Sequence, residues 1–320
     1  MATQPEIEAL YDWVHFFHTL RSGDYADFSC AFFDGNFNQT LAAAQNAKHQ
    51  WALEGIRFQP ADRILDVGCG WGPILNAVRK RGGMALGLTL SGAQARYCAA
   101  KGLEVLLQDW KTARPFTLGV FNGIISIGAF EHFCSMDEYI QGKQDSIYRD
   151  FFAFCARALP VGGRLFLQTM TWGKSVPNPE AASLTAPEGT PERIMGRLAK
   201  FYPGSWLPGG KEQIVAAASE HFNFLHSSNG RLDYIETLNR WEQDTANLFK
   251  PSRLPKTLWA ATRLLPRFCL DADFRVQIES VRRNDQQVCF QREIMSHERM
   301  FFEKKPAGEN RAGLVEALKN

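Results

Sequence analysis

Apolar runs of strand length alternate with stretches of helical spacing through the middle of the chain. Five runs predict buried strands: Arg63–Val67, Met84–Leu88, Glu104–Leu107, Gly119–Ile127 and Arg164–Thr169. Three intervening stretches predict helices, near Pro73–Arg81, Ser91–Lys101 and Ser146–Ala158. Strands separated by helices of this length are typical of a parallel sheet with helices on both faces. The pattern therefore predicts an α/β fold with a doubly wound sheet.

The pattern changes on both sides of this region. Before it, Ile7–Leu20 and Leu41–Leu53 have the spacing or composition of helices. After it, Ser175–Glu192 is rich in Pro, Ala, Thr and Ser, which indicates a long surface excursion or a lid over a pocket. The rest of the chain predicts a strand, a helix and a last strand, at His221–Ser227, Leu232–Leu248 and His297–Glu303.

Composition narrows the classes of function. The 320 residues include 36 basic and 34 acidic ones, and the net charge of +2 favours no nucleic acid partner. Seven cysteines without a C-x-x-C unit argue for a reducing compartment and against structural zinc or a disulfide framework, so we expect no metal site. Acidic residues throughout the first thirty positions exclude the core of a signal peptide, and no later run approaches a membrane span. We expect a cytoplasmic protein.

The segment 249–270 combines basic and apolar residues without an acid. Lys250, Arg253, Lys256, Arg263 and Arg267 are interleaved with leucines and aromatic residues. A basic amphipathic stretch can contact a membrane surface or an acidic acyl carrier. The plainer interpretation is a helix whose basic face is simply solvated.

A glycine-rich turn follows the first predicted strand, in the stretch Ile64-Leu65-Asp66-Val67-Gly68-Cys69-Gly70-Trp71-Gly72. Glycines spaced by one residue let a ligand approach the backbone closely. A dinucleotide site needs an acid at the end of the second strand, and here that strand ends in Leu88-Thr89-Leu90-Ser91. Asp66, two positions before Gly68, instead resembles the motif of S-adenosylmethionine methyltransferases.

Asp109 and Trp110 follow the third predicted strand. A carboxylate there can accept from an adenine amino group, and an indole can lie against the ring. Taken alone, Trp110 would be ordinary core. Together with the glycine turn, the two residues favour a nucleoside ligand.

Glu131 and His132 directly follow the apolar stretch Ile124–Phe130. They therefore lie at the carboxyl end of a predicted strand, where open α/β sheets have their ligand-binding and catalytic residues. Such a pair can hold an anion, relay a proton or form a buried hydrogen bond without catalytic function. Cys30 and Cys69 show no electropositive neighbour in the sequence, so neither is expected to be a nucleophile.

Four segments together resemble the cyclopropane fatty acid synthase and mycolic acid cyclopropane synthase family. They are Tyr11-Asp12 with Phe28-Ser29-Cys30, residues 65–72, residues 87–91 with Gln94, and residues 126–133. Residues 201–208 and 237–241 also resemble the family's cap and the following helix. The likeness covers roughly residues 11–245 in order, which makes it more specific than any one motif.

This resemblance implies a Rossmann-like class I methyltransferase fold, mostly parallel with an antiparallel last strand. It also implies four parts: an N-terminal helical segment (1–60) covering the cofactor, the core (61–170), a helical cap or lid (171–220) and a C-terminal completion of the sheet (221–320). The cofactor is expected to be S-adenosylmethionine. Its expected contacts are Tyr11, Phe28, Ser29, Asp66, Gly68, Gly70, Gly72, Thr89, Gln94, Asp109 and Trp110.

The reaction of this family implies a function for Glu131 and His132. Methylation of a carbon-carbon double bond leaves a carbocation, and a base must then remove a proton. By resemblance, that base is a bound bicarbonate held by Glu131, His132 and the backbone of Cys30. Glu131 would accept from the bicarbonate hydroxyl, since a carboxylate repels an anion unless a proton lies between them.

One departure concerns a tyrosine that completes the family's anion site. We expect it in the helix before the last strand, but Ile278–Asn284 contains none, and no tyrosine follows Tyr234. Phe28 also stands where the family has a tyrosine before Ser-Cys. Either another residue, such as Arg282 or Glu279, completes the site, or bicarbonate-assisted chemistry has been lost.

Three hypotheses follow. The first is an S-adenosylmethionine-dependent methyltransferase that acts on the double bond of a lipid acyl chain. The second is a C- or N-methyltransferase for a small hydrophobic metabolite such as a terpenoid or an alkaloid-like amine. The third is a catalytically silent binding or scaffold protein, against which the retained Glu131, His132 and glycine turn argue.

Overall fold

The computed structural model describes residues 27–306, apart from 115–117, 179–180, 203, 247–249 and 253. Tyr11 and the helix expected at Ile7–Leu20 lie outside the described residues. For Thr245, Ala246, Lys256, Ala260 and Arg263 only the backbone is described.

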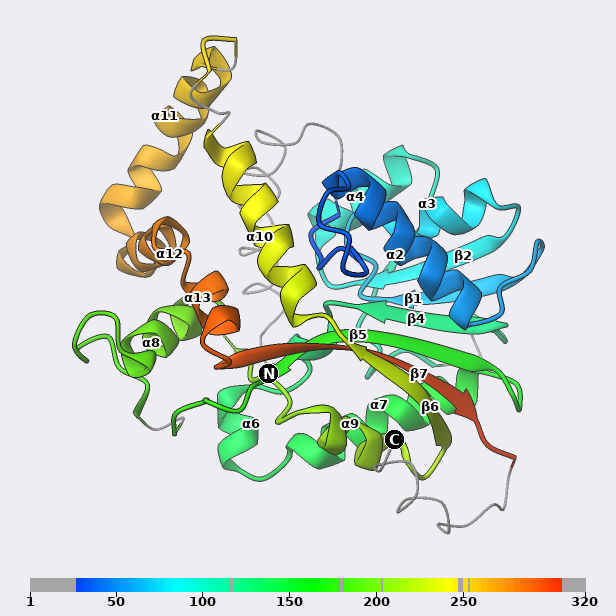
Figure 1. Cartoon of the computed structure of the whole chain (residues 1–320). Helices are drawn as coiled ribbons and strands as arrows, with labels where there is room; N and C mark the ends of the chain where they lie inside the picture. Colours follow the sequence, from blue (N-terminus) through cyan, green and yellow to red (C-terminus); the bar gives the residue numbers. More distant parts are fainter. Residues whose placement is uncertain are drawn as a thin grey trace.

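A seven-stranded sheet forms the centre of the molecule (Figure 1). Its strands are β1 (Arg63–Val67), β2 (Met84–Thr89), β3 (Glu104–Leu107), β4 (Gly123–Ile127), β5 (Arg164–Trp172), β6 (Phe222–Asn229) and β7 (Met295–Lys304). Their order is β3-β2-β1-β4-β5-β7-β6. The first five strands pair in parallel, and β7 is antiparallel to both β5 and β6. The predicted doubly wound α/β sheet with an antiparallel last strand is confirmed.

Successive side chains of a strand point to opposite faces of the sheet and pack into two apolar cores. Leu165 and Leu167 of β5 belong to one apolar cluster, whereas Phe166 between them belongs to another. Helices α7 (Gln144–Ala158) and α9 (Lys211–Ala218) cover the first face, and α2 (Leu41–Gly55) and α3 (Pro73–Lys80) cover the second (Figure 1). Helix α4 (Gly92–Ala100) follows β2 and packs beside β3. Because both faces are buried, the strands read as continuous apolar runs.

A group of helices extends beyond the ends of β5 and β7, on the left side of Figure 1. It contains α8 (Pro191–Phe201), α10 (Arg231–Ala246), α11 (Leu254–Leu270), α12 (Ala272–Arg282) and α13 (Asp285–Gln291). Helices α8, α12 and α13 contact one another, and α10 packs against α13 and β7. Within the described ranges, no helix is both long enough and apolar enough to cross a membrane.

Some elements differ from the sequence pattern. The strand expected from Gly119 begins at Gly123, because Gly119 has φ +87° and Phe121 N bonds outside the sheet to Ala158 O at 3.0 Å. Helix α6 (Met136–Ile140) was not predicted, although Ser135 and Glu138 form a capping box at its start. Helix α9 lies within the predicted cap but packs against α7. The four-part division of the chain remains a prediction.

Candidate active site

The turn after β1 presents backbone to the edge of the sheet. Gly68 has φ +81°, and a Cβ there would lie 2.2 Å from the Cβ of Ala129, so the turn touches the chain that leaves β4. Gly70 has φ +54°, and no described atom lies within 4 Å of the place its Cβ would take. A ligand can therefore approach the Gly70 backbone, close to the start of α3.

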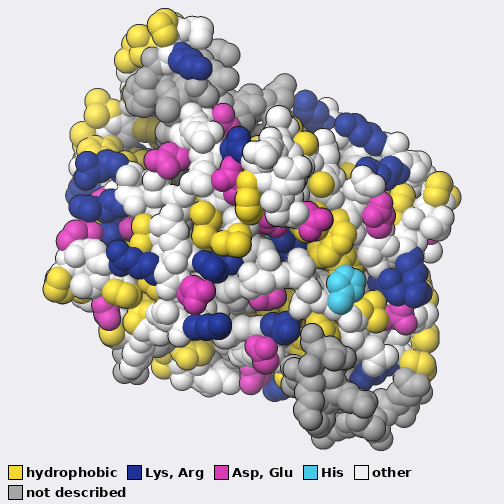
Figure 2. All heavy atoms as spheres, in the orientation of Figure 1, with side chains coloured by type: hydrophobic (Ala, Val, Ile, Leu, Met, Phe, Trp, Pro, Cys, Tyr) yellow, Lys and Arg dark blue, Asp and Glu magenta, His cyan; other side chains and the backbone are white. Residues whose placement is uncertain are grey.

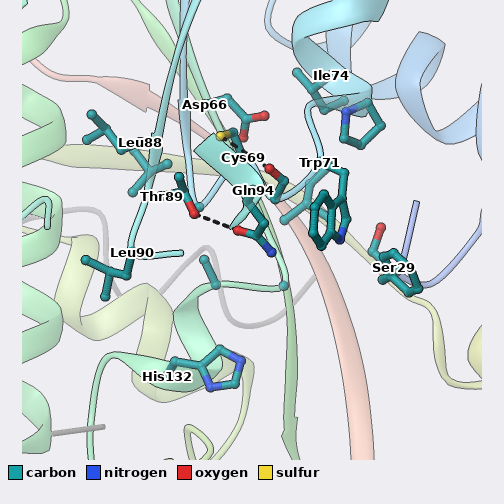
Figure 3. A pocket seen from close by; sticks show the side chains of 18 of the residues that line it. Ser29, Asp66, Cys69, Trp71, Ile74, Leu88, Thr89, Leu90, Gln94 and His132 are labelled. Atoms are coloured by element: carbon teal, nitrogen blue, oxygen red, sulfur yellow. Dashed lines mark hydrogen bonds between the residues drawn. The ribbon is translucent and has the colours of Figure 1, made fainter. Parts of the chain in front are cut away.

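This turn forms one wall of a cavity at the carboxyl ends of the parallel strands (Figure 3). In the figure, Asp66, Thr89 and Gln94 lie together, and His132 lies at the other end of the view. Nine predicted cofactor residues line the cavity: Phe28, Ser29, Asp66, Gly68, Gly70, Thr89, Gln94, Asp109 and Trp110.

Thr89 and Gln94 form a joined polar pair in this wall. Thr89 Oγ1 donates to Gln94 Oε1 at 2.6 Å, and Gln94 N donates to Oγ of Ser91, the N-cap of α4. The side-chain nitrogen of Gln94, Nε2, has no hydrogen-bond partner among the described residues. It can therefore donate to a hydroxyl group of a ligand in the cavity.

Trp110 contributes to both the core and the cavity. Its ring centroid lies 5.1 Å from that of Phe133 and 5.4 Å from that of Phe151. Asp109 Oδ1 accepts from Lys111 N at 2.9 Å, which orients the carboxylate. The two interpretations of Trp110, core residue and ligand contact, are therefore compatible.

Gly72, also predicted as a cofactor contact, is not among the residues that line this cavity. A Cβ there would lie 2.7 Å from Leu103 Cδ1 and 3.1 Å from Cys98 Sγ, so the residue faces packed side chains. With φ +75°, it lets the chain turn into α3.

The cavity favours a cation at its Asp66 end. Burial, and then the charge of Asp27, raise the pKa of Asp66 to about 8. Asp27 is itself paired with Lys48 Nζ at 2.8 Å and His49 Nε2 at 2.7 Å. Burial alone would raise the pKa of Asp27, but Lys48 and His49 hold it well below its usual range. A bound cation would return Asp66 to its ionised form.

Glu131 sits in a short 3₁₀ turn, Phe130–His132, directly after β4. Phe130 is fully buried against Tyr148, with ring centroids 4.3 Å apart, and this packing holds the turn in place. Glu131 is 2% exposed, and its Oε1 accepts from Met170 N of β5 at 2.8 Å. Its Oε2 has no hydrogen-bond partner among the described residues. Burial raises the pKa of Glu131 to about 7.

His132 lines the first cavity and also a second one. Its Nδ1 lies 2.7 Å from Ser205 Oγ, so the two adjacent side chains have different partners. Burial lowers the pKa of His132 to about 4, which keeps the imidazole neutral near pH 7. It can thus exchange a hydrogen bond without carrying a charge.

The second cavity is mainly apolar, with Glu131 and His132 among its few polar residues. Its lining includes four methionines, Met136, Met170, Met195 and Met295, with Trp172, Leu198, Tyr202, Trp206 and Leu207. Methionine side chains adapt to flexible apolar ligands. Ala182 of the predicted excursion also lines it, so that segment contributes to the cavity wall.

Cys30 is buried and lines neither cavity. Burial raises the pKa of its thiol to about 12, so the thiol stays protonated. Three side chains instead fix the surrounding backbone: Gln168 Nε2 donates to Cys30 O, Thr237 Oγ1 accepts from Ala31 N, and Arg299 Nη2 donates to Ala31 O. The expectation that Cys30 acts through its backbone fits this arrangement.

The sequence prediction missed two buried polar residues near Glu131. Gln168 Oε1 has no hydrogen-bond partner among the described residues. Tyr234 of α10 is buried. Burial is the main cause that raises its pKa well above the usual value, and the nearby Tyr202, Cys30 and Glu131 raise it less. The signal for Tyr234 was its position three residues before the segment 237–241, which resembles the family.

Neither of the two replacements proposed from the sequence reaches this site. Glu279 and Arg282 line neither cavity, and Glu279 forms a surface ion pair with Arg283 at 2.9 Å. Tyr234 is the tyrosine near Glu131, and Gln286 links it to β5 by donating to Tyr234 Oη at 3.5 Å and to Met170 Sδ at 3.3 Å. Tyr234 belongs to α10, whereas residues 278–284, where a tyrosine was expected, lie at the end of α12 and just beyond it.

Comparison with known proteins agrees with this geometry. The sequence model described as mycolic acid cyclopropane synthetase matches residues 2–250. Cyclopropane mycolic acid synthase 2 of Mycobacterium leprae is 33% identical over 258 residues, covering 74% of this chain and 79% of that protein. The S-adenosylmethionine-dependent methyltransferase UmaA of Mycobacterium tuberculosis is 30% identical over 246 residues, covering 74% of this chain and 80% of that protein.

Solved structures show the same fold. The mycolic acid cyclopropane synthase CmaA1, complexed with SAH and CTAB, superposes with a TM-score of 0.71 at 25% identity, covering 94% of this chain and 98% of that one. The cyclopropane synthase MmaA2 from Mycobacterium tuberculosis gives the same TM-score and coverage at 23% identity. This chain belongs to the mycolic acid cyclopropane synthetase family and is an S-adenosylmethionine-dependent methyltransferase.

Proposed function

We propose that the protein methylates a carbon-carbon double bond of a lipid acyl chain. The observation that carries the proposal is the position of His132 between two different cavities, one with several polar side chains and one with few, with Glu131 in the wall of the second. An acyl chain in the apolar cavity would approach the cofactor cavity at this shared wall. A cytoplasmic location and the four-part division of the chain belong to the same proposal.

The first cavity fits S-adenosylmethionine. The ligand is cationic, and Asp66 and Asp109 supply carboxylates in the wall. The open Gly70 backbone suits close approach, and Thr89 with Gln94 would hold hydroxyl groups. When bound, S-adenosylmethionine supplies an electrophilic methyl group. The protein's contribution is alignment of the acceptor and exclusion of water from the reacting centre.

Proton removal is assigned to the region around Glu131. Glu131 Oε2 and Gln168 Oε1 are buried acceptors without described partners, which suits a ligand that brings its own hydroxyl. Bicarbonate has such a hydroxyl, and it would supply the base for the proton released by the substrate. Glu131 would accept from that hydroxyl, and Tyr234 is a nearby donor for an anion.

His132 and Cys30 would have supporting functions. A neutral His132, hydrogen-bonded to Ser205, would orient groups at the wall between the cavities rather than balance a full negative charge. Cys30 would contribute its backbone N–H, since the surrounding backbone groups are tied to Gln168, Thr237 and Arg299. Residue Cys30 is therefore assigned no nucleophilic step.

The acceptor can be identified with methyl-labelled S-adenosylmethionine. The purified protein would be incubated with phospholipids bearing unsaturated chains, the same phospholipids after hydrogenation, and a panel of terpenoids and cyclic amines. We expect label only in the unsaturated lipid, because a saturated chain offers no nucleophilic carbon. Label confined to an amine or a terpenoid would contradict the acyl-chain proposal.

A matched pair of tyrosine variants tests the assigned proton site in the same assay. Tyr234→Phe removes a hydroxyl near Glu131 and should reduce methyl transfer by at least about tenfold. Tyr139→Phe removes a hydroxyl from an exposed residue of α6 and should leave transfer unchanged. Equal activity of the two variants would contradict the role of Tyr234.

A further inference from the structure

Helix α11 exposes an apolar stripe along its length. Leu254, Leu258, Ala261, Leu265 and Phe268 recur at alternating spacings of four and three residues, which places them on one helical face. Leu258 and Leu265 are each 58% exposed, although leucine is usually buried. Trp259 and Leu270 add further exposed apolar surface on the same helix. In Figures 1 and 2, α11 lies at an outer corner of the molecule, and apolar side chains gather there.

The sequence that contains this stripe carries charge of one sign only. No acidic residue occurs from position 245 to 270, whereas five basic residues do: Lys250, Arg253, Lys256, Arg263 and Arg267. Arg267 also packs over the ring of Phe274, 4.5 Å from its centroid, which attaches α11 to α12. The combination of an apolar face with basic residues fits an anionic lipid surface.

Apolar contacts connect α11 to the second cavity. Leu264 of α11 packs in a cluster with Phe274 of α12 and with Phe201 and Tyr202 at the end of α8. Tyr202 also lines the second cavity, as do Met195 and Leu198 of α8. Only the layer formed by α8 and α12 would therefore separate the apolar cavity from a surface that contacts α11.

Two other occupants are less suited to the stripe. A coiled coil with a second copy needs about three or more heptads, and this stripe spans fewer. Pro266 inside the helix and the like charge of two basic helices also oppose such pairing. An acidic carrier protein would pair with the basic residues but would leave the leucine stripe in water.

We propose that α11 docks the protein on the surface of an anionic lipid bilayer, with Leu254, Leu258, Leu265 and Phe268 inserted at the headgroup boundary. The inference deepens the proposed function and rests on it, because docking at α11 would bring the apolar cavity close to its lipid substrate. The basic residues of 249–270 would supply attraction to anionic headgroups, and the leucines would hold the helix there.

Vesicle flotation tests this docking directly. The full-length protein would be mixed with vesicles of phosphatidylcholine alone, or of equal parts phosphatidylcholine and phosphatidylglycerol. We expect at least about tenfold stronger binding to the anionic vesicles, weakened by added salt. The double variant Leu258→Glu/Leu265→Glu should lower this binding by at least about tenfold, because each substitution places a charge where apolar surface would be buried.

The matched control is Val120→Glu/Ile140→Glu, at two apolar residues that are each 67% exposed and lie outside α11. It should bind vesicles as the parent does. Binding of S-adenosylhomocysteine by both double variants verifies that they fold. Equal binding of the parent to both vesicle types, or unchanged binding of the α11 variant, would overturn the proposal.

Two further measurements distinguish docking on lipid from pairing with a protein and from failure of the proposed function. The α11 variant should still methylate detergent-dispersed lipid while losing activity on vesicles, whereas failure of the proposed function would abolish transfer to both by the parent. Light scattering would detect a dimer that the α11 variant loses, and a pull-down would detect an acidic acyl carrier protein. Either result without vesicle binding would overturn docking on lipid.

Discussion

Replacing Glu131 by glutamine should make the protein more stable at alkaline pH while removing its activity. The side chain is 2% exposed, and burial raises its pKa from 4.5 to about 7. In the unfolded chain the same carboxyl ionises near its ordinary value. Between these two pKa values the folded state therefore binds the extra proton, so stability falls as the pH rises through this window. Glutamine stays neutral and can still accept the bond from Met170 N.

The size of the effect follows from the shift. One pKa unit corresponds to about 1.4 kcal/mol, so a shift of about 2.5 units costs the ionised parent about 3 kcal/mol above pH 7. Part of this cost is already present at about pH 5. We therefore expect the stability of Glu131→Gln relative to the parent to increase by about 2 to 3 kcal/mol between about pH 5 and about pH 8.

Urea unfolding of both proteins at the two pH values measures this change. The comparison uses the difference between variant and parent, because titration of all other groups then cancels. Methyl transfer to the unsaturated lipid, measured alongside, should fall by at least about 100-fold, since glutamine cannot accept a proton from the ligand. The control Glu104→Gln changes an exposed carboxylate on β3 and should alter neither quantity.

The reasoning would be refuted by a stability difference that stays constant within about 0.5 kcal/mol across the pH range. Glu131 would then be ionised in the folded protein at both values. Stabilisation with full activity would instead show that the buried carboxyl has no part in proton removal.

Two further substitutions test the support of the site. Arg299→Gln removes the ion-pair partner of Asp233, which lies 2.9 Å away, and the hydrogen-bond donor to Ala31 O. We expect urea unfolding to show a free energy of unfolding lower by about 3 to 5 kcal/mol. The control Arg57→Gln, on the surface, should lower it by less than about 1 kcal/mol. Gln94→Leu removes an amide that lines the cofactor cavity and should weaken S-adenosylhomocysteine binding by about tenfold in calorimetry; unchanged affinity would contradict this placement.

Local sequence patterns predicted much of the sheet. Arg63–Val67 and Glu104–Leu107 form strands with the predicted bounds, because short apolar runs between turn residues have few alternatives. The predicted start of β4 at Gly119 was wrong because the turn at Gly119 and the bond from Phe121 N to Ala158 O, far along the chain, delay the start of the strand to Gly123. A strand boundary that is set by a distant partner cannot be predicted from neighbouring residues alone.

Some residues of the candidate site could be predicted from local sequence, and others could not. Asp66 and Thr89 lie at the ends of β1 and β2, and Gly68 and Gly70 follow β1. Their meeting at one edge of the sheet could therefore be predicted from their positions alone. Tyr234 and Gln168 could not be assigned in this way. Tyr234 approaches Glu131 only because α10 packs across β7. Gln168 lies within the predicted part of β5, but its hydrogen bond to Cys30 O joins residues that are far apart in the sequence.

By itself, the sequence determined the α/β architecture, the glycine turn and the acid and imidazole after β4. Apolar periodicity and backbone conformation are local properties, so neighbouring residues suffice to specify them. Only the tertiary structure decided that Glu131 and His132 have separate partners, that Gly72 faces the core and that Tyr234 lies near Glu131. Burial and contact depend on which distant elements pack together, and that packing sets the pKa and the partners of each buried group.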